Sequence, residues 1–294
     1  MWGQVFTFYF WYFMTRPLRI EYPGAVYHIT SRGNKKMSIY ESDEDRVVFL
    51  KVLAKIIRKH HWKCYAYCLM LNHYHLLVET THGNLSTGMR DLNGIYTQMY
   101  NKKHETVGHI FQGRFKAFLI EKETYLFEVA RYIVLNPVRA GIVKTPQKYR
   151  WSNYLATAGL DFAPSFLDVD GLLKNFGYKR TASQEQYRAF ILDGIHRDSP
   201  FIGARPGMIL GSPQFESEIS KITGDPDIAV EVTKDEKLIG RLTLAELFEV
   251  YEGKNERNEI VKLAVNGYGY SNASVAKHLG LSNTTISLIA RGKK

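Results

Sequence analysis

The chain has 294 residues, of which 45% are hydrophobic and 23% are charged, and its formal net charge is +10. This hydrophobic content suffices for a folded core and excludes a mainly disordered chain. The positive charge lies in residues 1–150, which contain 22 Lys and Arg against 11 Asp and Glu, together with eight of the ten histidines. Such a basic region is typical of proteins that bind a polyanion such as nucleic acid.

The aromatic, uncharged stretch 2–13 is too short to cross a bilayer as a helix. It also lacks the basic leader and the cleavage site of a signal peptide. We therefore expect translation to begin at Met14, with residues 1–13 as an upstream extension. Two cysteines, Cys64 and Cys68, cannot form a disulfide framework, so reduced thiols in a cytoplasmic protein are the simplest interpretation. No membrane partner is expected.

Strands and helices alternate in the first half of the chain. Alternating apolar and polar residues predict a strand over 24–32, and apolar residues at helical spacing predict a helix over 42–60. Two further strands are predicted over 62–70 and 73–80, where they form a hairpin. A second amphipathic helix is predicted over 84–103.

A basic stretch, 108–121, is predicted to contain a fourth strand, followed by a third helix over 123–136. We expect Pro137 to end this helix, because a proline disfavours helical geometry in the residue before it. The order of elements predicts an α+β fold in which helices flank an antiparallel sheet. A doubly wound parallel sheet is the weaker alternative.

Residues beyond about 160 are predicted to be mainly helical. Short helices are expected at 168–176, 182–195, 213–223 and 243–253, with a Gly- and Pro-rich connector at 199–212. The segment from Arg257 predicts a C-terminal helix-turn-helix with Ser282 as the N-cap of its last helix. Its inward-facing residues are Ala276, Leu279, Ile286 and Ile289. The predicted regions are the extension 1–13, a main domain 14–160, a helical connector 161–240 and a helix-turn-helix domain 241–294.

His73 and His75 lie two residues apart in a predicted strand, so their side chains share one face of the sheet. Two neighbouring imidazoles can bind one divalent metal through one nitrogen each. The alternative interpretation is a pair of partly buried polar residues without a ligand.

Tyr132 and Asn136 lie four residues apart on the third predicted helix and therefore share one face. An amide oxygen suits the coordination of magnesium or manganese. The alternative is a core aromatic and a helix-capping Asn. Spacing alone does not select the nucleophile, because Tyr125 and the pair Tyr96 and Tyr100 admit the same argument.

Four sequence blocks resemble the REP-associated tyrosine transposases, which belong to the HUH single-strand transposases. In chain order they are MTRPLRIEYPGAVYHITSRGN, HYHLLVET, GHIFQGRFK and YIVLNPVRAGIV, and the resemblance covers about residues 14–160. It implies a ferredoxin-like α+β domain in which His73, His75 and Asn136 hold Mg²⁺ or Mn²⁺ and Tyr132 is the nucleophile. Tyr74 stands where an aliphatic residue is common, and its side chain is expected to point away from the metal.

The resemblance further implies an enzyme of the bacterial nucleoid that cleaves and rejoins single-stranded DNA near hairpins formed by repetitive extragenic palindromes. Attack by Tyr132 on phosphorus would leave a 5′-phosphotyrosine link and a free 3′-hydroxyl. Many related enzymes act as homodimers and others act alone, and the sequence does not decide between these states. Two alternatives are a non-catalytic DNA-binding regulator on a transposase scaffold and a metal-dependent nuclease without a covalent intermediate.

Basic side chains around these blocks are predicted to follow the DNA backbone, and Phe111, Phe115 or Phe118 to stack on exposed bases. The helix-turn-helix is predicted to supply a second contact through its last helix. The predicted DNA contacts are Arg32, Lys35, Lys36, Arg114, Lys116, Arg131 and Arg139 in the main domain and Asn283, Thr284, Thr285 and Arg291 in the last helix. For each of them the alternative is a solvated surface group or a core residue.

Overall fold

The computed structural model describes residues 20–202, 209–223, 244–248, 251, 253–267 and 270–292. The predicted extension and the predicted start at Met14 lie outside these residues. Within these residues there are two hydrophobic cores, one built from residues between Ala25 and Ile219 and a smaller one built mainly from residues between Phe248 and Ile289. No helix in the described part of the chain is long and apolar enough to cross a bilayer.

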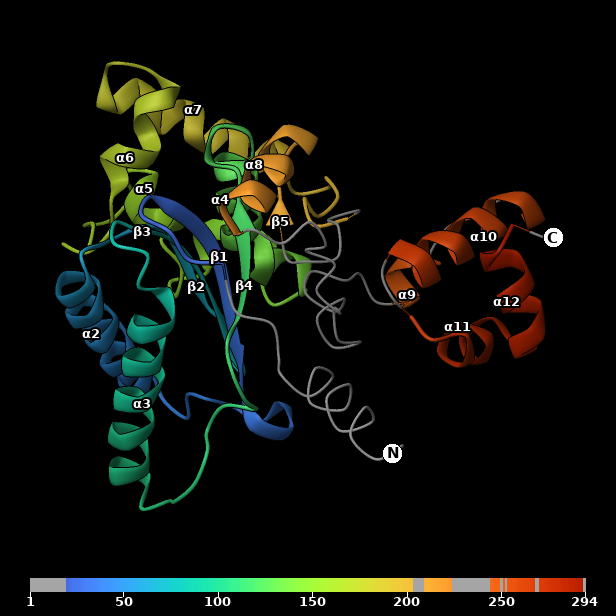
Figure 1. Ribbon diagram of the computed structural model, residues 1–294, viewed down its shortest axis with the longest axis horizontal. Helices are drawn as coiled ribbons and strands as arrows, with labels where there is room; N and C mark the ends of the chain where they lie inside the picture. Colours follow the sequence, from blue (N-terminus) through green and yellow to red (C-terminus); the bar gives the residue numbers. More distant parts are fainter. Residues whose placement is uncertain are drawn as a thin grey trace, which may run out of the picture.

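One sheet with the strand order β2-β3-β1-β4-β5 organises the larger core (Figure 1). Its central strand β1 (Ala25–Arg32) runs antiparallel to both β3 (His73–Thr80) and β4 (Lys116–Ile120), and β3 also pairs antiparallel with β2 (Trp62–Leu69). The short edge strand β5 (Ile209–Leu210) pairs in parallel with β4. The predicted α+β fold with an antiparallel sheet is therefore confirmed for the four longer strands.

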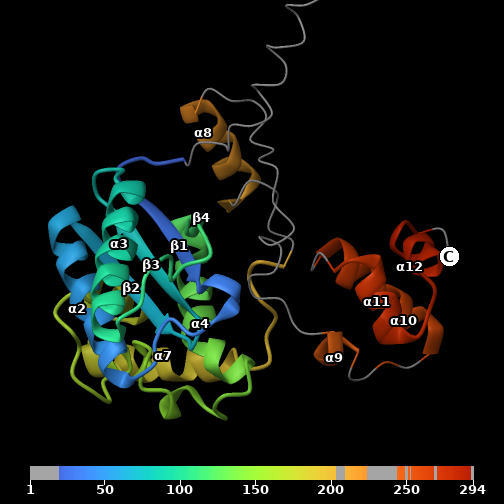
Figure 2. The same cartoon turned by 90° about the horizontal axis from the view of Figure 1, so that it is seen from below.

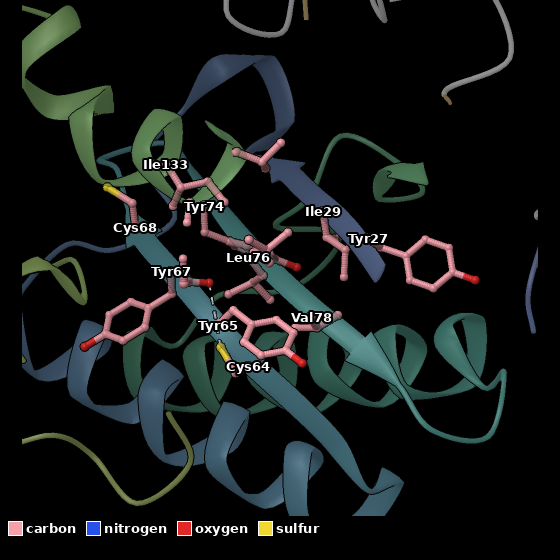
Figure 3. Packing of buried hydrophobic residues seen from close by; sticks show 14 of the residues in the cluster. Tyr27, Ile29, Cys64, Tyr65, Tyr67, Cys68, Tyr74, Leu76, Val78 and Ile133 are labelled. Carbon is pink, nitrogen blue, oxygen red and sulfur yellow. Dashed lines mark hydrogen bonds between the residues drawn. The ribbon is translucent and has the colours of Figure 1, made fainter. Parts of the chain in front are cut away.

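Helices cover both faces of this sheet (Figures 1 and 2). The amphipathic helices α2 (Asp43–His60) and α3 (Leu85–His104) lie on one face, and α4 (Lys122–Arg139) lies on the other. On the first face the ring of Phe49 packs against Tyr74 with the centroids 4.8 Å apart. Figure 3 shows Tyr74, Leu76 and Val78 at alternate positions of β3, within the buried cluster.

The N-terminus of α2 is held by a buried carboxylate. Asp45 accepts hydrogen bonds from the backbone amides of Glu41 and Ser42 at 2.8 and 3.1 Å. The same side chain accepts from Lys103 at 2.8 Å, and it lies 3.1 Å from His104 Nε2. It therefore satisfies orphan amides at the start of α2 and ties that helix to the end of α3.

Pro137 does not end α4, contrary to the sequence prediction, because the helix continues to Arg139. A proline inside a helix removes the hydrogen bond to the carbonyl four residues earlier, here that of Ile133. The Asn136 amide nitrogen lies 3.4 Å from this carbonyl and 2.9 Å from that of Tyr132, and it donates to both. The side chain of Asn136 thus compensates for the missing backbone donor and allows α4 to pass through the proline.

The helices within residues 169–223 pack on the larger core. Leu172 of α6 (Val169–Leu173), Tyr187 and Ile191 of α7 (Arg180–Asp193) and Ile219 of α8 (Pro213–Thr223) are all buried in it. The region predicted as a connector therefore contributes side chains to the same core as the sheet. Four further short helical elements lie between residues 20 and 202, namely η1 (Asn34–Lys36), η2 (Pro146–Lys148), α5 (Tyr154–Thr157) and η3 (Lys174–Phe176).

The smaller core joins the C-terminal helices. They are α9 (Leu244–Leu247), α10 (Gly253–Lys262), the π-helical turn η5 (Leu263–Gly267), α11 (Asn272–Leu279) and α12 (Asn283–Ala290). Ser282 caps α12 as predicted, because its hydroxyl accepts from the Thr285 amide at 3.1 Å. Ala276, Ile286 and Ile289 are buried, and Leu279 is partly buried. Two helices and the turn between them therefore occupy the predicted residues, and their role in DNA binding stays a proposal.

Candidate active site

The histidines of the HYH block lie on the face of the sheet that α4 covers. Arg32 pairs with His73 and Thr30 with His75 in the β1–β3 register, so the odd-numbered residues of β3 share a face with the even-numbered residues of β1. Tyr74 lies on the opposite face, where its hydroxyl donates to Asn93 Oδ1 of α3 at 2.6 Å. The pleat therefore separates Tyr74 from the two histidines, as the sequence predicts.

Three imidazoles meet on the α4 face. His28 of β1 lies fully buried beside His75, with His28 Nε2 and His75 Nδ1 2.9 Å apart and the two rings almost parallel. The ring of His73 lies 5.0 Å from that of His75, centroid to centroid. Sequence reasoning missed His28, because only the pairing of β1 with β3 brings it to this position.

Each histidine of the HYH block leaves one ring nitrogen without a hydrogen-bond partner among the residues that the structure describes. His73 Nδ1 donates to Asn72 Oδ1 at 2.7 Å, so its Nε2 carries the lone pair. His75 Nε2 is buried and lacks a hydrogen-bond partner within the described ranges. Burial lowers the pKa of His73 to about 3, with a smaller effect from Arg32, and it lowers the pKa of His75 well below 6.5. Both rings are therefore neutral, which is the form that binds metal.

Tyr132 of α4 packs its ring edge-on against both His28 and His75, at centroid distances of 5.8 and 6.0 Å. Its side chain is only 1% exposed, and its hydroxyl has no hydrogen-bond partner among the residues described. Burial raises the pKa of Tyr132 well above 10, while the cation of Arg139 and the amide of Asn136 act in the opposite direction. The guanidinium of Arg139 lies 5.5 Å from the centroid of the Tyr132 ring.

The other tyrosines considered from spacing are engaged elsewhere. Tyr96 donates to the Ile39 carbonyl and Tyr100 to Glu41, both on the α3 side of the sheet. Tyr125 is half-buried against the larger core and lies in the first turn of α4. Among these candidates the structure brings Tyr132 to the histidines.

Asn136 uses its amide nitrogen within α4, which leaves Oδ1 as its available ligand atom. Two neutral imidazole nitrogens and an amide oxygen suit a divalent cation chemically. Within the described ranges no group of three or more His, Cys, Asp or Glu side chains is arranged to hold a metal ion. A cation at this place would therefore depend on the amide oxygen, on the substrate or on water for its further ligands.

Phe201 covers the site from a segment that follows α7. Its ring stacks on His28 at 4.8 Å and meets the ring of Tyr132 at 5.2 Å, centroid to centroid. Arg139 holds this segment by donating to the Arg197 carbonyl at 2.6 Å. Sequence reasoning treated the region as a connector, and no local signal in it predicts a contact with Tyr132.

The predicted DNA contacts divide into three groups. Exposed side chains are those of Arg32, Lys35, Lys36, Arg114, Asn283, Thr284 and Arg291. Lys116 and Thr285 are half-buried, and half-buried Arg139 is bonded to backbone carbonyls. Arg131 is only 4% exposed, pairs with Glu128 and lies over the Phe190 ring of α7, so its predicted role as a surface contact is wrong. Its side chain therefore faces α7.

The three phenylalanines predicted to stack on bases are buried as well. Phe111 contacts Tyr74 and Tyr96 in the core, and Phe118 packs against His28 and Phe201. A buried ring offers no face to an incoming base, so in this conformation these residues serve packing.

Comparison with protein families identifies residues 22–136 as a match to the family described as "Transposase IS200 like". One solved structure that resembles the chain is titled "Structure of the REP associates tyrosine transposase bound to a REP hairpin". It has 18% sequence identity and a TM-score of 0.43, and the match covers 53% of this chain and 94% of that chain. The comparison with curated proteins gives no match. The matched stretch runs from just before β1 to Asn136 and contains the three histidines and Tyr132, so this part of the chain is similar to the IS200-like transposases.

Proposed function

We propose that the chain is a metal-dependent REP-associated tyrosine transposase that cuts and rejoins single-stranded DNA, with Tyr132 as its nucleophile. The observation that carries this proposal is the contact of Tyr132 with the His75 ring, inside the stretch that matches the IS200-like transposases. A regulator that had lost catalysis would have no need to keep this tyrosine beside two histidines with available nitrogens.

His73, His75 and Asn136 would hold a divalent metal, Mg²⁺ or Mn²⁺. When bound, such a cation supplies charge neutralisation and orientation of the scissile phosphate. The Tyr132 oxygen attacks phosphorus and forms a phosphotyrosine link to the 5′ end of the downstream DNA fragment. The 3′ oxygen of the upstream fragment leaves with the bonding electrons and takes up a proton to become a free 3′-hydroxyl. Attack by a 3′-hydroxyl on the phosphotyrosine reverses the step and rejoins DNA without ATP, because the covalent link keeps the bond energy.

The tyrosine must lose its proton to attack, and burial opposes this. Arg139 and Arg32 both favour the phenolate of Tyr132. A DNA strand that reaches Tyr132 has to displace the ring of Phe201. This displacement would give Tyr132 a phosphate and solvent as neighbours in place of an apolar ring. We propose that the nucleophile is protected until substrate enters.

Exposed basic residues border the His73 end of the sheet. Arg32 is the residue opposite His73, and Lys35 and Lys36 follow directly in η1. The Asn34 amide donates to the Ile110 carbonyl at 2.7 Å, which places the loop that leads to Arg114 beside η1. We propose that this basic surface holds the backbone of single-stranded DNA next to hairpins of repetitive extragenic palindromes. The C-terminal helices would add a second contact through Asn283, Thr284, Thr285 and Arg291.

The test is incubation of the full chain with hairpin-containing single-stranded DNA and Mn²⁺ or Mg²⁺. A protein–DNA adduct that survives denaturation and is absent from Tyr132→Phe supports the tyrosine mechanism. His73→Ala should abolish cleavage while it leaves much of the DNA binding. Cleavage that persists in Tyr132→Phe would indicate the nuclease, and binding without cleavage under both metals would indicate the regulator.

A further inference from the structure

The rings of His28 and His75 share a hydrogen bond, and the tautomers of the two rings decide which of them donates. A neutral imidazole, the form in which a histidine binds a cation, carries a single N–H. His28 Nε2 and His75 Nδ1 are 2.9 Å apart, so one of these two nitrogens donates and the other accepts.

The two arrangements have opposite consequences for His75. If His75 Nδ1 donates, its Nε2 carries a lone pair and can bind a cation. If His28 Nε2 donates, the hydrogen of His75 lies on Nε2, where it blocks coordination. The ligand capacity of His75 is therefore decided by the tautomer of the residue beside it.

We infer that His28 is a positioning residue that accepts a hydrogen bond from His75 Nδ1 and so holds His75 in the tautomer whose Nε2 can bind a divalent cation. This inference deepens the proposed function and rests on it. Metal-binding histidines commonly donate their second nitrogen to a neighbouring acceptor, which fixes both ring orientation and tautomer. For His73 that acceptor is Asn72 Oδ1, and for His75 the acceptor that the geometry offers is His28.

His28 is held rigidly enough for this role. It lies in the central strand, fully buried, with its ring stacked against Phe201 at 4.8 Å and Phe118 at 6.4 Å. The backbone pairs of β1 with β3 and β4 set its position relative to His75. A neutral acceptor also adds no negative charge to the site, which leaves the charge of a bound cation available to a phosphate.

Two substitutions of His28 distinguish the effect of its hydrogen-bond acceptor from the effect of its aromatic ring. His28→Phe keeps an aromatic ring between Phe118 and Phe201 and removes the acceptor. His28→Gln places an amide oxygen near the position of Nε2 and restores an acceptor. Phe118→Leu is the matched control, because it alters a neighbour of His28 and leaves both imidazoles in place.

The first measurement is long-range ¹H–¹⁵N correlation of the histidine rings in the metal-free protein, with His75 assigned through His75→Gln. We expect the Nδ1–H tautomer of His75 in the wild type, in His28→Gln and in Phe118→Leu. An Nε2–H tautomer of His75 in the wild type would overturn the inference. This result needs neither metal nor DNA, so it is independent of whether Tyr132 forms an adduct.

The second measurement is calorimetric titration of each folded variant with Mn²⁺ alone. The dissociation constant should rise about 10–100-fold in His28→Phe, the range typical for loss of an orienting partner, and stay near the wild-type value in His28→Gln. Equal affinity of His28→Phe and the wild type overturns the positioning role, as does a His28→Gln variant as weak as His28→Phe. A wild type that shows the predicted tautomer but fails to cleave DNA would contradict the proposed function alone.

Discussion

The ring of Phe201 lies 5.2 Å from that of Tyr132, at an interplanar angle of 75°. Phe201 follows α7, outside the stretch that matches the transposase family, whereas Tyr132 is inside it. The nucleophile proposed here is therefore covered by a residue from another part of the chain. This relationship has consequences for access, for stability and for the reactivity of the tyrosine.

Removal of the Phe201 ring should expose Tyr132 and speed its reaction. Phe201→Ala eliminates the contact with the tyrosine and keeps the bonds from Arg139 to the backbone of residues 197 and 198. We expect faster adduct formation with hairpin DNA. The free energy of unfolding should fall by less than the roughly 3–5 kcal/mol typical of a fully buried Phe, because this ring is half-buried.

Phe166→Ala is the control for Phe201→Ala, because Phe166 is half-buried against Tyr67 and has no ring contact with the site among the described residues. It should lower stability without a faster reaction. A folded Phe201→Ala variant that reacts at the wild-type rate would show that the ring does not limit access.

Tyr132→Phe should abolish the adduct and leave the fold at least as stable as before. The hydroxyl of Tyr132 is buried without a hydrogen-bond partner in the described structure, so its removal relieves a desolvation cost of about 1–3 kcal/mol. Urea denaturation measures this change, and denaturing electrophoresis measures the adduct.

Tyr96→Phe should have the opposite effects on stability and on the adduct. It removes the 2.6 Å hydrogen bond from the Tyr96 hydroxyl to the Ile39 carbonyl on the far face of the sheet, which should cost about 1 kcal/mol and preserve adduct formation. A Tyr132→Phe variant that is strongly destabilised would contradict the account of an unsatisfied hydroxyl.

Low pH should weaken the contact between α2 and α3, because it protonates the Asp45 carboxylate that joins them. Burial disfavours its charged form, but hydrogen bonds from Lys103, His104 and the amides of Glu41 and Ser42 outweigh burial and hold its pKa at about 2, below the ordinary 3.8. A depressed carboxyl pKa stabilises the fold above the unfolded-state value, and the contribution is lost as the pH falls from about 4 towards 2. The loss corresponds to about 2 kcal/mol.

Urea midpoints of the wild type and Asp45→Asn at pH 7 and near pH 2 measure this contribution. The difference between the two proteins should be large at pH 7 and small at the lower pH. The matched variant Asp43→Asn alters a side chain that is 52% exposed and should show little difference at either pH. A constant gap between wild type and Asp45→Asn across this range would contradict the assignment.

Substitutions of Arg131 and Arg114 should distinguish a role in packing from a role in DNA binding. Arg131→Ala removes a buried side chain that contacts Glu128 and Phe190, so it should lower the free energy of unfolding. Arg114→Ala removes an exposed charge, so it should weaken DNA binding at unchanged stability. The slope of log affinity against log salt concentration should become shallower by about 1, as expected for the loss of one phosphate contact. Fluorescence anisotropy at several salt concentrations, together with thermal unfolding, tests both. Loss of DNA affinity in a fully stable Arg131→Ala protein would restore the surface role for Arg131.

Local pattern in the sequence was sufficient to predict the four longer strands and the helices α2, α3 and most of α4, whereas the short α5 and β5 were not predicted. The alternation around His73 and His75 requires that they share a face, whatever the partner strand is. The structure confirms β3 at 73–80 as predicted and places α2 within one residue of its predicted start. Pro137 shows the limit of a local rule, because the Asn136 side chain replaces the missing donor and α4 continues.

The sequence by itself determined the α+β order of elements, the common face of His73 and His75 and the helical spacing of Tyr132 and Asn136, since these follow from the periods of strand and helix. Only the tertiary structure decided which residues surround them. Strand register brought His28 to His75, the packing of α4 on α7 buried Arg131, and the return of the chain after α7 set Phe201 on Tyr132. These contacts join segments distant in sequence, and no local periodicity encodes such pairings.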